Sequence, residues 1–282
     1  GVAFQRAVTL LQGAPARSLV THHPVGLRGP LPALTPVIKK GSDRLETLEV
    51  VGLTLRHPGS GRGIENISFK LERGSLTVIT GRIGSGKTTL LRACLGLLRP
   101  QAGEVRWNGQ KIEHPARFLT PPRVAYTPQV PTLLSGTRRY NILTGIPNDA
   151  HAVQDAVRRA VFERDVSGFP DKLDTVIGVR GMKLSGGQVQ RTAAARMFVR
   201  EPELLIFDDL SSALDVETEH TLWQRVFERD ATCLVVSFRR AVLEQADQVL
   251  LLEDGRIAAR GRLEELLETS IEMQRLCAGE LG

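Results

Sequence analysis

The sequence is short of cysteine and of long apolar runs, and each shortage excludes a class of protein. Its three cysteines, Cys94, Cys233 and Cys277, are scattered and odd in number, so a disulfide framework and a cysteine metal site are not expected and a reducing compartment is favoured. Apolar runs stay well below the ~18 residues that cross a bilayer, and no signal-peptide pattern occurs. These residues are therefore not expected to span a membrane.

Positive charge is concentrated at the N-terminus. The formal net charge is +6, and residues 1–44 contribute +5 through six lysines and arginines against Asp43. The remainder is nearly neutral, so the charge does not indicate nucleic-acid binding. The same segment holds five of the 15 prolines and is predicted to be an extended connector after a helix end at FQRAVTLLQG. A first residue of glycine fits a fragment of a longer chain, and a disordered basic tail is the alternative.

From Leu45 onward, short apolar runs alternate with helical stretches. The runs ETLEVVGLTLRH and ENISFKLERG, joined by the turn PGSGRG, predict an antiparallel pair of strands. The next strand, SLTVIT, has the continuous apolar character of a strand buried on both faces. This alternation predicts an α/β fold with a mostly parallel sheet, helices on both faces, and ligands at the carboxyl ends of the strands.

A phosphate-binding loop follows SLTVIT directly. Residues 81–88 match the pattern G-x-x-x-x-G-K-[ST] between a strand and a helix, which is the context that the pattern requires. Backbone N–H groups of such a loop converge on phosphate oxygens at a helix N-terminus. The lysine reaches the β- and γ-phosphates, and the following hydroxyl coordinates magnesium. The residues are Gly81, Arg82, Ile83, Gly84, Ser85, Gly86, Lys87 and Thr88, with Thr89 next in the helix.

Two adjacent acids end the apolar run LLIFDD. Unpaired charges beside a buried strand cost several kcal/mol, so they require a reason. Given a bound nucleotide, Asp208 is predicted to hold the magnesium ion, as strand-end acids do in P-loop proteins. Asp209 is one residue further toward the γ-phosphate and is a candidate to polarise the attacking water.

Residues 184–188 read LSGGQ, and here the chain resembles the nucleotide-binding domain of ATP-binding cassette (ABC) transporters. The resemblance covers roughly residues 45–275, and its motifs are in the family order. GRIGSGKTT resembles Walker A, TPQ the Q-loop, LLIFDD Walker B, SALD the D-loop, and VVSFRR the switch segment. The resemblance implies a P-loop NTPase domain at 45–282, with an N-terminal antiparallel β-subdomain. It also implies an inserted α-helical subdomain at about 130–195 that carries the signature.

The resemblance also implies the ligands, ATP and Mg²⁺, and the residues that bind them. It assigns magnesium to Thr88, Gln129 and Asp208, and catalysis to Lys87, Gln129, Asp209 and the switch position Phe238. It assigns nucleotide contacts to His57, at the position of the aromatic that stacks on adenine, and to the loop from Gly81 to Thr89. The remaining contacts act in trans, across a head-to-tail dimer, through Ser185, Gly186, Gly187, Gln188 and Asp215. Physically, Ser185 is a good N-cap, so this segment offers a hydroxyl and N–H donors to an anion.

The stretch YTPQVPTLLSGTRRYNIL resembles exporter-type members, in which this region precedes a helix that contacts the membrane domain. TVIGVRGMKLSGGQ is similar to their segment before the signature, except that Val176 and Val179 stand where acids are common. The implied partners are a transmembrane domain and a second ABC ATPase domain, with no nucleic acid. Residues 1–44 would then link a last transmembrane helix to a cytosolic ATPase domain at the membrane's cytoplasmic face, where basic residues are favoured.

Two positions depart from the family's hydrolytic pattern. The family usually has glutamate after the Walker B aspartate, and this chain has Asp209, whose carboxylate reaches one methylene less far. Misplacement by about 1 Å can cost ~100-fold in rate. The family usually has histidine at the switch, and Phe238 cannot hydrogen-bond a γ-phosphate. A core residue at a strand end is the plainer interpretation of Phe238. His57 replaces the usual larger aromatic and stacks with less area; an ordinary exposed residue before a proline is the alternative interpretation.

These departures affect ATP held by the chain's own loop, whereas Ser185, Gly187 and Asp215, which it would present to a partner, are intact. This asymmetry resembles one subunit of a heterodimeric exporter with a slow site and a competent site. The alternatives are a homodimeric slow ATPase, a soluble ABC protein outside transport, and a module that binds ATP for regulation only. GTP is disfavoured because no Asn-Lys-x-Asp element occurs in the sequence.

Overall fold

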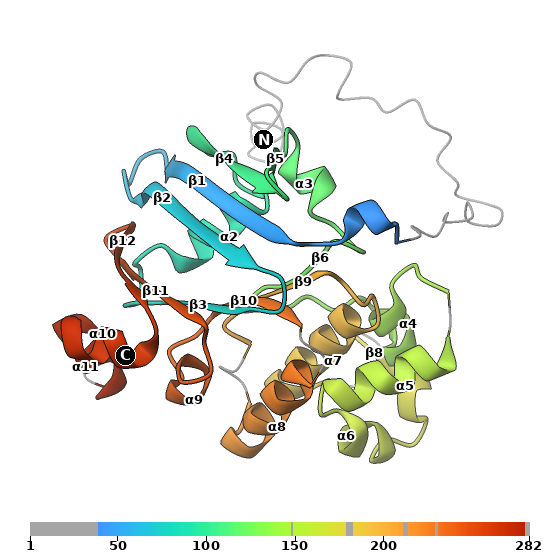
Figure 1. Ribbon diagram of the computed structural model, residues 1–282. Helices are drawn as coiled ribbons and strands as arrows, with labels where there is room; N and C mark the ends of the chain where they lie inside the picture. The colour runs from blue at the N-terminus through green and yellow to red at the C-terminus, as the bar shows by residue number, and fades with distance from the viewer. Residues whose placement is uncertain (1–38, 148, 179–182, 211–213, 229–230, 280–282) are drawn as a thin grey trace, which may run out of the picture. The chain divides into compact units, whose positions relative to one another are not determined.

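The computed structural model describes residues 39–147, 149–178, 183–210, 214–228 and 231–279 (Figure 1). The predicted connector therefore lies outside the described residues except for its last six, 39–44. These include the 3₁₀ helix η2 (Gly41–Asp43). The Lys39 ammonium lies 2.6 Å from the Glu203 carboxylate, and Asp43, which is buried, pairs with Arg123 at 2.5 Å. Ion pairs thus hold residues 39–43 to the rest of the described chain.

The central sheet has six strands in the order β12-β11-β3-β10-β9-β6. They are β3 (Leu76–Thr80), β6 (Val124–Thr127), β9 (Leu204–Asp208), β10 (Thr232–Val236), β11 (Gln248–Glu253) and β12 (Arg256–Gly261). All pairs are parallel except β11 with β12. Every residue of β3, β9 and β10 is buried, as expected for parallel strands covered on both faces. In this register Val236 pairs with both Ile79 and Asp208. The C-terminal ends of β3 and β9, including the strand-end acids, therefore lie at the same edge of the sheet.

A second, antiparallel sheet has the order β2-β1-β4-β5. Its strands are β1 (Thr47–Arg56), β2 (Gly63–Glu72), β4 (Ala102–Trp107) and β5 (Gln110–Lys111). Helix α2 (Lys87–Cys94) buries Leu90 and Leu91 in one apolar cluster with residues from both sheets. This helix therefore lies between the two sheets, with its N-terminus fixed by their packing.

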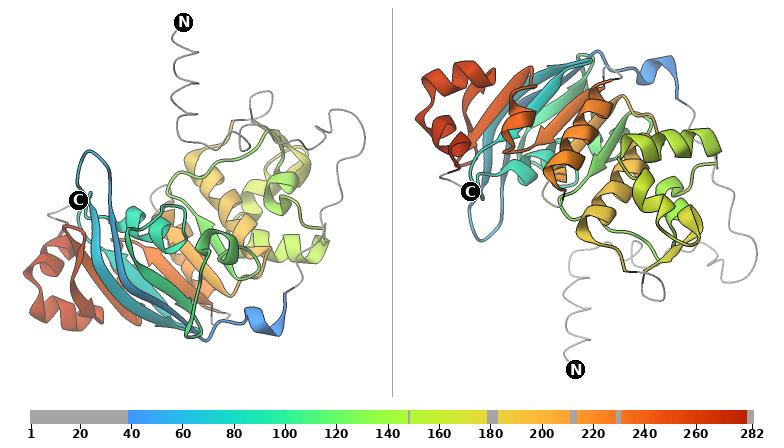
Figure 2. Two further views of the ribbon diagram at one scale, coloured as in Figure 1. Left: turned by 90° about the horizontal axis from the view of Figure 1, so that it is seen from above. Right: turned by 90° about the horizontal axis from the view of Figure 1, so that it is seen from below.

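The other face of the central sheet packs against helices through a second apolar cluster. The helices between β6 and β9 are α4 (Arg138–Leu143), α5 (Ala150–Arg159), α6 (Glu163–Ser167) and α7 (Gly186–Phe198), with η3 (Lys172–Asp174) and the short strands β7 (Gly136–Thr137) and β8 (Val176–Ile177). Helix α7 contacts α4, α5 and β6, and the small residues 193–195 are buried there. Both views in Figure 2 place α4 to α7 together at one side of the sheets.

The remaining helices are short apart from one. They are α3 (Pro115–Phe118), α8 (Val216–Phe227), α9 (Arg240–Leu243), α10 (Leu263–Thr269) and α11 (Ile271–Cys277). Within the described residues, no helix is both long and apolar enough to cross a bilayer. The predicted α/β fold is confirmed: a mostly parallel sheet with helices on both faces, an antiparallel N-terminal sheet, and a helical insertion that includes the LSGGQ segment.

Candidate functional site

The loop between β3 and α2 is shaped by glycines that other residues could not replace. Gly81 has φ +137°, and a Cβ there would lie 2.1 Å from the Leu252 carbonyl oxygen. Gly86 has φ +104° and is the N-cap of α2. Both conformations favour glycine, because side chains clash in this region of backbone space. The loop therefore turns tightly onto the helix N-terminus, which is the geometry that binds phosphate.

Lys87 lies in the first turn of α2 and points back over this loop. Its ammonium donates to the carbonyl oxygens of Gly81 at 2.6 Å and Arg82 at 2.7 Å. Burial lowers the pKa of Lys87, and the charges of Asp209 and Asp208 oppose that shift. A cation held beside a helix N-terminus favours the binding of anions in this loop.

Thr88 and Asp208 meet as the predicted magnesium site requires. The Thr88 hydroxyl donates to a carboxylate oxygen of Asp208 at 3.0 Å, and the Tyr126 hydroxyl lies 3.4 Å from the other oxygen. Burial raises the pKa of Asp208, and these two hydrogen bonds oppose that shift. A bound cation would stabilise the ionised carboxylate. The sequence did not predict Tyr126 as a site residue. Its position in RVAYTPQ, shortly before Gln129, was the signal that could have indicated it.

Asp209 and Gln129 also meet. The Gln129 side-chain amide donates to an Asp209 carboxylate oxygen at 3.2 Å. Asp209 is 8% exposed, and burial raises its pKa, with the adjacent charge of Asp208 acting in the same direction. Its backbone N–H donates to the Val236 carbonyl oxygen at 3.1 Å. Because a raised pKa makes a carboxylate a better proton acceptor, the environment of Asp209 suits a general base.

The donor atoms gathered here fit Mg²⁺. A hydroxyl, a carboxylate and an amide are hard oxygen donors, and Mg²⁺ typically takes one or two carboxylates and completes its shell with phosphate oxygens and water. The described residues hold no group of three or more His, Cys, Asp or Glu side chains that could bind a metal alone. The set Thr88, Gln129 and Asp208 therefore suits a metal that arrives with a phosphate ligand.

Phe238 follows β10 at the predicted switch position. Its side chain is 51% exposed, so the interpretation as a core residue is wrong. The Arg239 guanidinium lies 5.6 Å from the Phe238 ring centroid and 3.6 Å from a carboxylate oxygen of buried Glu219 on α8. The switch segment thus presents a ring that has no hydrogen-bonding group.

His57 lies immediately after β1. Its Nε2 is 3.3 Å from the Thr89 hydroxyl of α2, and the side chain is partly buried. This contact places the imidazole beside α2, the helix that follows the phosphate loop. The base of a nucleoside triphosphate bound by the loop could stack on the imidazole there. The predicted adenine-contacting position and the loop are therefore adjacent.

The signature segment begins α7. Ser185 is the N-cap, and its hydroxyl accepts from the Gln188 N–H while the Gln188 side chain accepts from the Ser185 N–H. Gln188 also donates to Asp165 on α6 at 3.0 Å. Ser185 and Gly186 are exposed. The segment is thus a rigid, solvent-facing helix start, available to a second molecule.

Asp215 begins α8 in the same way. Its carboxylate accepts from the Thr218 N–H at 2.9 Å and from the Thr218 hydroxyl at 2.7 Å, and these bonds lower the pKa of Asp215. Asp215 is exposed, whereas Ser212 and Ala213, the first two residues of the SALD motif, lie outside the described residues.

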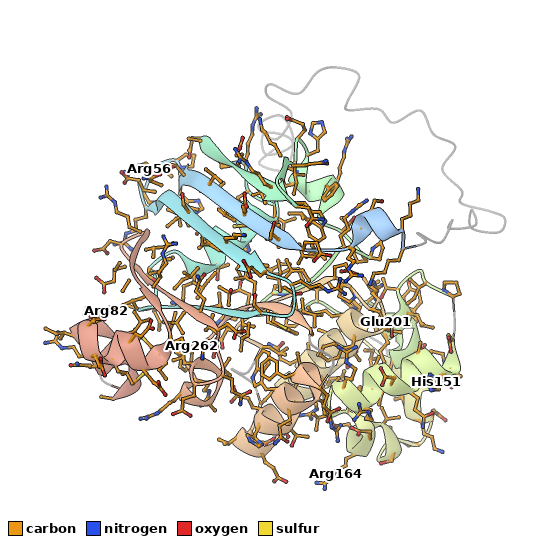
Figure 3. The ribbon with its side chains drawn as sticks, viewed as in Figure 1. Arg56, Arg82, His151, Arg164, Glu201 and Arg262 are labelled. Carbon is orange, nitrogen blue, oxygen red and sulfur yellow. The ribbon has the colours of Figure 1, made fainter. Side chains whose placement is uncertain are left out.

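One contact at the loop was not predicted. The Arg82 guanidinium forms a two-pronged ion pair with Glu272 on α11, with one bond at 2.6 Å, and Figure 3 shows Arg82 beside the C-terminal helices. The two residues are 190 positions apart, so no local pattern indicated the pair. It ties the exposed part of the phosphate loop to the C-terminal segment.

A strand, glycine loop and helix, with a strand-end acid bonded to the loop threonine, define a P-loop nucleotide-binding protein. The profile of the ABC transporter family matches residues 64–212. The chain belongs to this family.

Curated relatives and a solved structure agree with this assignment. YfiB of Bacillus subtilis (strain 168), an uncharacterized ABC transporter ATP-binding protein, is 35% identical over 245 residues, covering 86% of this chain and 43% of its own. The ATP-dependent lipid A-core flippase of Pseudomonas fluorescens (strain Pf0-1) is 34% identical over 238 residues, covering 82% and 39%. A bacterial Atm1-family ABC exporter with ATP bound matches with a TM-score of 0.78 and 26% identity, covering 89% of this chain and 44% of that one. The chain thus spans less than half of each of these proteins.

Proposed function

We propose that this chain is the ATP-binding and ATP-hydrolysing motor of an ABC exporter. The observation that carries the proposal is the meeting of two pairs at one sheet edge: Thr88 with Asp208, and Gln129 with Asp209. Lys87 and the loop N–H groups would bind the phosphates of ATP, and Thr88, Asp208 and Gln129 would hold Mg²⁺. The ion would neutralise charge on the β- and γ-phosphates. Asp209 would orient and polarise the attacking water, with Gln129 holding its carboxylate.

The proposed partners are a transmembrane domain and a second ABC ATPase domain, at the cytoplasmic face of a membrane. Exposed apolar side chains follow Gln129 in the exporter-like stretch: Val130 is 81% exposed, Leu134 45% and Tyr140 51%. Apolar groups at this exposure favour a contact surface. Helices α4 to α7 would form the subdomain that meets the membrane domain and presents the signature to the second ATPase domain, within an ATPase domain at 45–282. Residues 1–44 would link it to the membrane domain.

The proposal includes a slow cis site. Asp209 is short, and the exposed Phe238 has no group to bind a γ-phosphate. The same two residues favour a second function for the chain, that of an ATP-binding regulatory module. In either case the intact Ser185 and Asp215 would complete a competent site on a partner that carries the usual glutamate and histidine.

Equilibrium binding tests the proposal. We expect the full chain to bind a fluorescent ATP analogue, more tightly with Mg²⁺ than without it. Lys87→Ala should weaken binding by about 100-fold, because it removes a charge-assisted contact to phosphate. Lys111→Ala, which removes an exposed lysine on β5, is the matched control and should bind normally. A chain that binds no ATP with or without Mg²⁺ would overturn the proposal.

A further inference from the structure

Helix α7 reaches the candidate site through a buried side chain that the proposed chemistry does not use. Gln190, 3% exposed, donates its side-chain amide to the backbone carbonyl oxygen of Gln129 at 2.7 Å. A buried amide N–H is costly unless it is hydrogen-bonded, so this bond favours one position of the Gln190 side-chain nitrogen. The bond therefore joins α7, the helix that begins with the signature segment, to Gln129, whose side chain contacts Asp209.

Gln129 needs such an anchor. Strand β6 pairs with β9 only as far as Thr127, so Gln129 lies beyond the end of the sheet ladder, and its side chain is exposed. Its amide nevertheless lies 3.2 Å from the Asp209 carboxylate. Since no strand pairing fixes residue 129, its backbone position depends on the helix beside it.

Helix α7 also contacts the segment after Gln129, through a residue nearer the C-terminal end of the helix. Arg196 donates to the Thr132 carbonyl oxygen at 3.1 Å and to the Asn141 carbonyl oxygen at 2.7 Å. Gln190 and Arg196 are both on α7, whose first turn is fixed by the Ser185 and Gln188 capping bonds. Rigid secondary elements can carry coupling between sites, so a shift of the signature end of α7 would change the position of residues 129–132.

We propose that Gln190 is a positioning residue of the ATP site. It holds the Gln129 backbone so that the Gln129 amide faces Asp209, and it couples the signature end of α7 to that contact. The effect of Gln190 on the ATP site rests on the proposed function. The anchoring of the Gln129 backbone does not, because it can be measured in the chain without nucleotide.

The test uses two variants of the full chain and one matched control. Gln190→Glu keeps the size and removes the donor; Gln190→Met removes all hydrogen bonding at similar volume. Gln154→Glu makes the same chemical change at an exposed position of α5. Without nucleotide, we expect amide exchange in residues 128–134 to accelerate about 10-fold in both Gln190 variants. Exchange in β3 and α2 should stay unchanged in all three.

A functional readout separates positioning from general destabilisation. With ATP, both Gln190 variants should lose the gain in affinity that Mg²⁺ gives, as Gln129→Ala does, while affinity without Mg²⁺ stays within about 2-fold of the parent. In the Gln129→Ala background, Gln190→Glu should add no further loss. A purely structural role would instead weaken binding in both conditions and add to Gln129→Ala.

The outcomes are distinguishable. Unchanged exchange at 128–134 in both Gln190 variants would overturn the inference, as would a normal Mg²⁺ effect in both. A parent chain that binds no ATP would contradict the proposed function, and the exchange measurement would still decide whether Gln190 anchors Gln129.

Discussion

At the residue scale, the backbone conformation of Asp209 explains why aspartate suits this position, where the family usually has glutamate. Asp209 has φ +53°, in the left-handed region that aspartate and asparagine tolerate better than most residues. Its N–H is bonded to the Val236 carbonyl oxygen, which fixes this conformation. Aspartate therefore suits the local backbone here even though its carboxylate reaches less far than the glutamate usual in the family.

Restoring the family's usual residues should raise the rate of ATP hydrolysis and lower the free energy of unfolding. For Asp209→Glu with Phe238→His, we expect ATP hydrolysis by the chain to rise by about 100-fold, since a longer base and a hydrogen-bonding switch are both restored. Glutamate at a left-handed φ should lower the free energy of unfolding by about 1 kcal/mol. Steady-state hydrolysis and urea unfolding measure the two effects. Phe238→Leu is the control for the switch position, and an unchanged rate in the double variant would show that these residues do not limit turnover.

The buried carboxylate also predicts a pH effect on stability. Burial raises the pKa of Asp209, so the folded chain favours the protonated form, and stability present at low pH is lost as pH rises through the raised pKa. An asparagine in its place carries no charge and tolerates the same left-handed backbone. We therefore expect Asp209→Asn to melt on the order of 2 °C higher than the parent at pH 7.5 without nucleotide.

The difference should vanish near pH 4, where the aspartate of the unfolded chain also becomes protonated, at a pKa of about 3.9. Asp171→Asn, at an exposed position, should show no comparable gain. A variant less stable than the parent at pH 7.5 would mean that the ionised carboxylate stabilises the fold.

At the scale of elements, the sequence predicts those parts whose cause is local. The apolar run of β3, the glycines after it and Lys87 lie within a short stretch, so the strand, loop and helix could be predicted from the pattern. The N-cap role of Ser185 follows in the same way, because capping depends on neighbouring residues. Asp208 could be placed near Thr88 because carboxyl ends of parallel strands share an edge.

The contacts that the sequence could not predict join separate elements. Gln190 bonds to Gln129 only because α7 packs on β6, and Arg82 meets Glu272 only because α11 returns to the loop. The φ of Asp209 depends on β10 being its neighbour. Each is set by tertiary packing, which local preference does not encode. These contacts link the phosphate loop and the Q-loop to distant segments, and motifs alone do not show them.

At the scale of the whole molecule, the residues fall into two sets. Lys87, Thr88, Asp208 and Asp209 gather at one sheet edge and would act on ATP bound by this chain. Ser185 and Asp215 are exposed at the starts of two helices, where their polar contacts are to their own caps. Groups that are rigid and solvent-facing suit recognition by a second molecule, because no ordering is required on binding.

Trans action predicts complementation between two defective chains. Lys87→Ala should lose ATP binding but keep its signature; Ser185→Arg should bind ATP but block the partner's nucleotide with a large side chain. We expect neither variant alone to form an ATP-dependent dimer in analytical ultracentrifugation, whereas an equal mixture should do so through one composite site. The slow hydrolysis proposed for the site at Asp209 would prolong the dimer and so make it measurable.

Loss of the Ser185 cap should cost about 1 kcal/mol, so a melting curve of Ser185→Arg must first show a folded chain. Its own ATP affinity should match the parent's, because the phosphate loop is intact. If Ser185→Arg dimerised with ATP as readily as the parent, or if the mixture stayed monomeric while the parent dimerised, the signature would not be acting across the dimer. The asymmetry between a weakened cis site and an intact donated surface would then have no functional meaning.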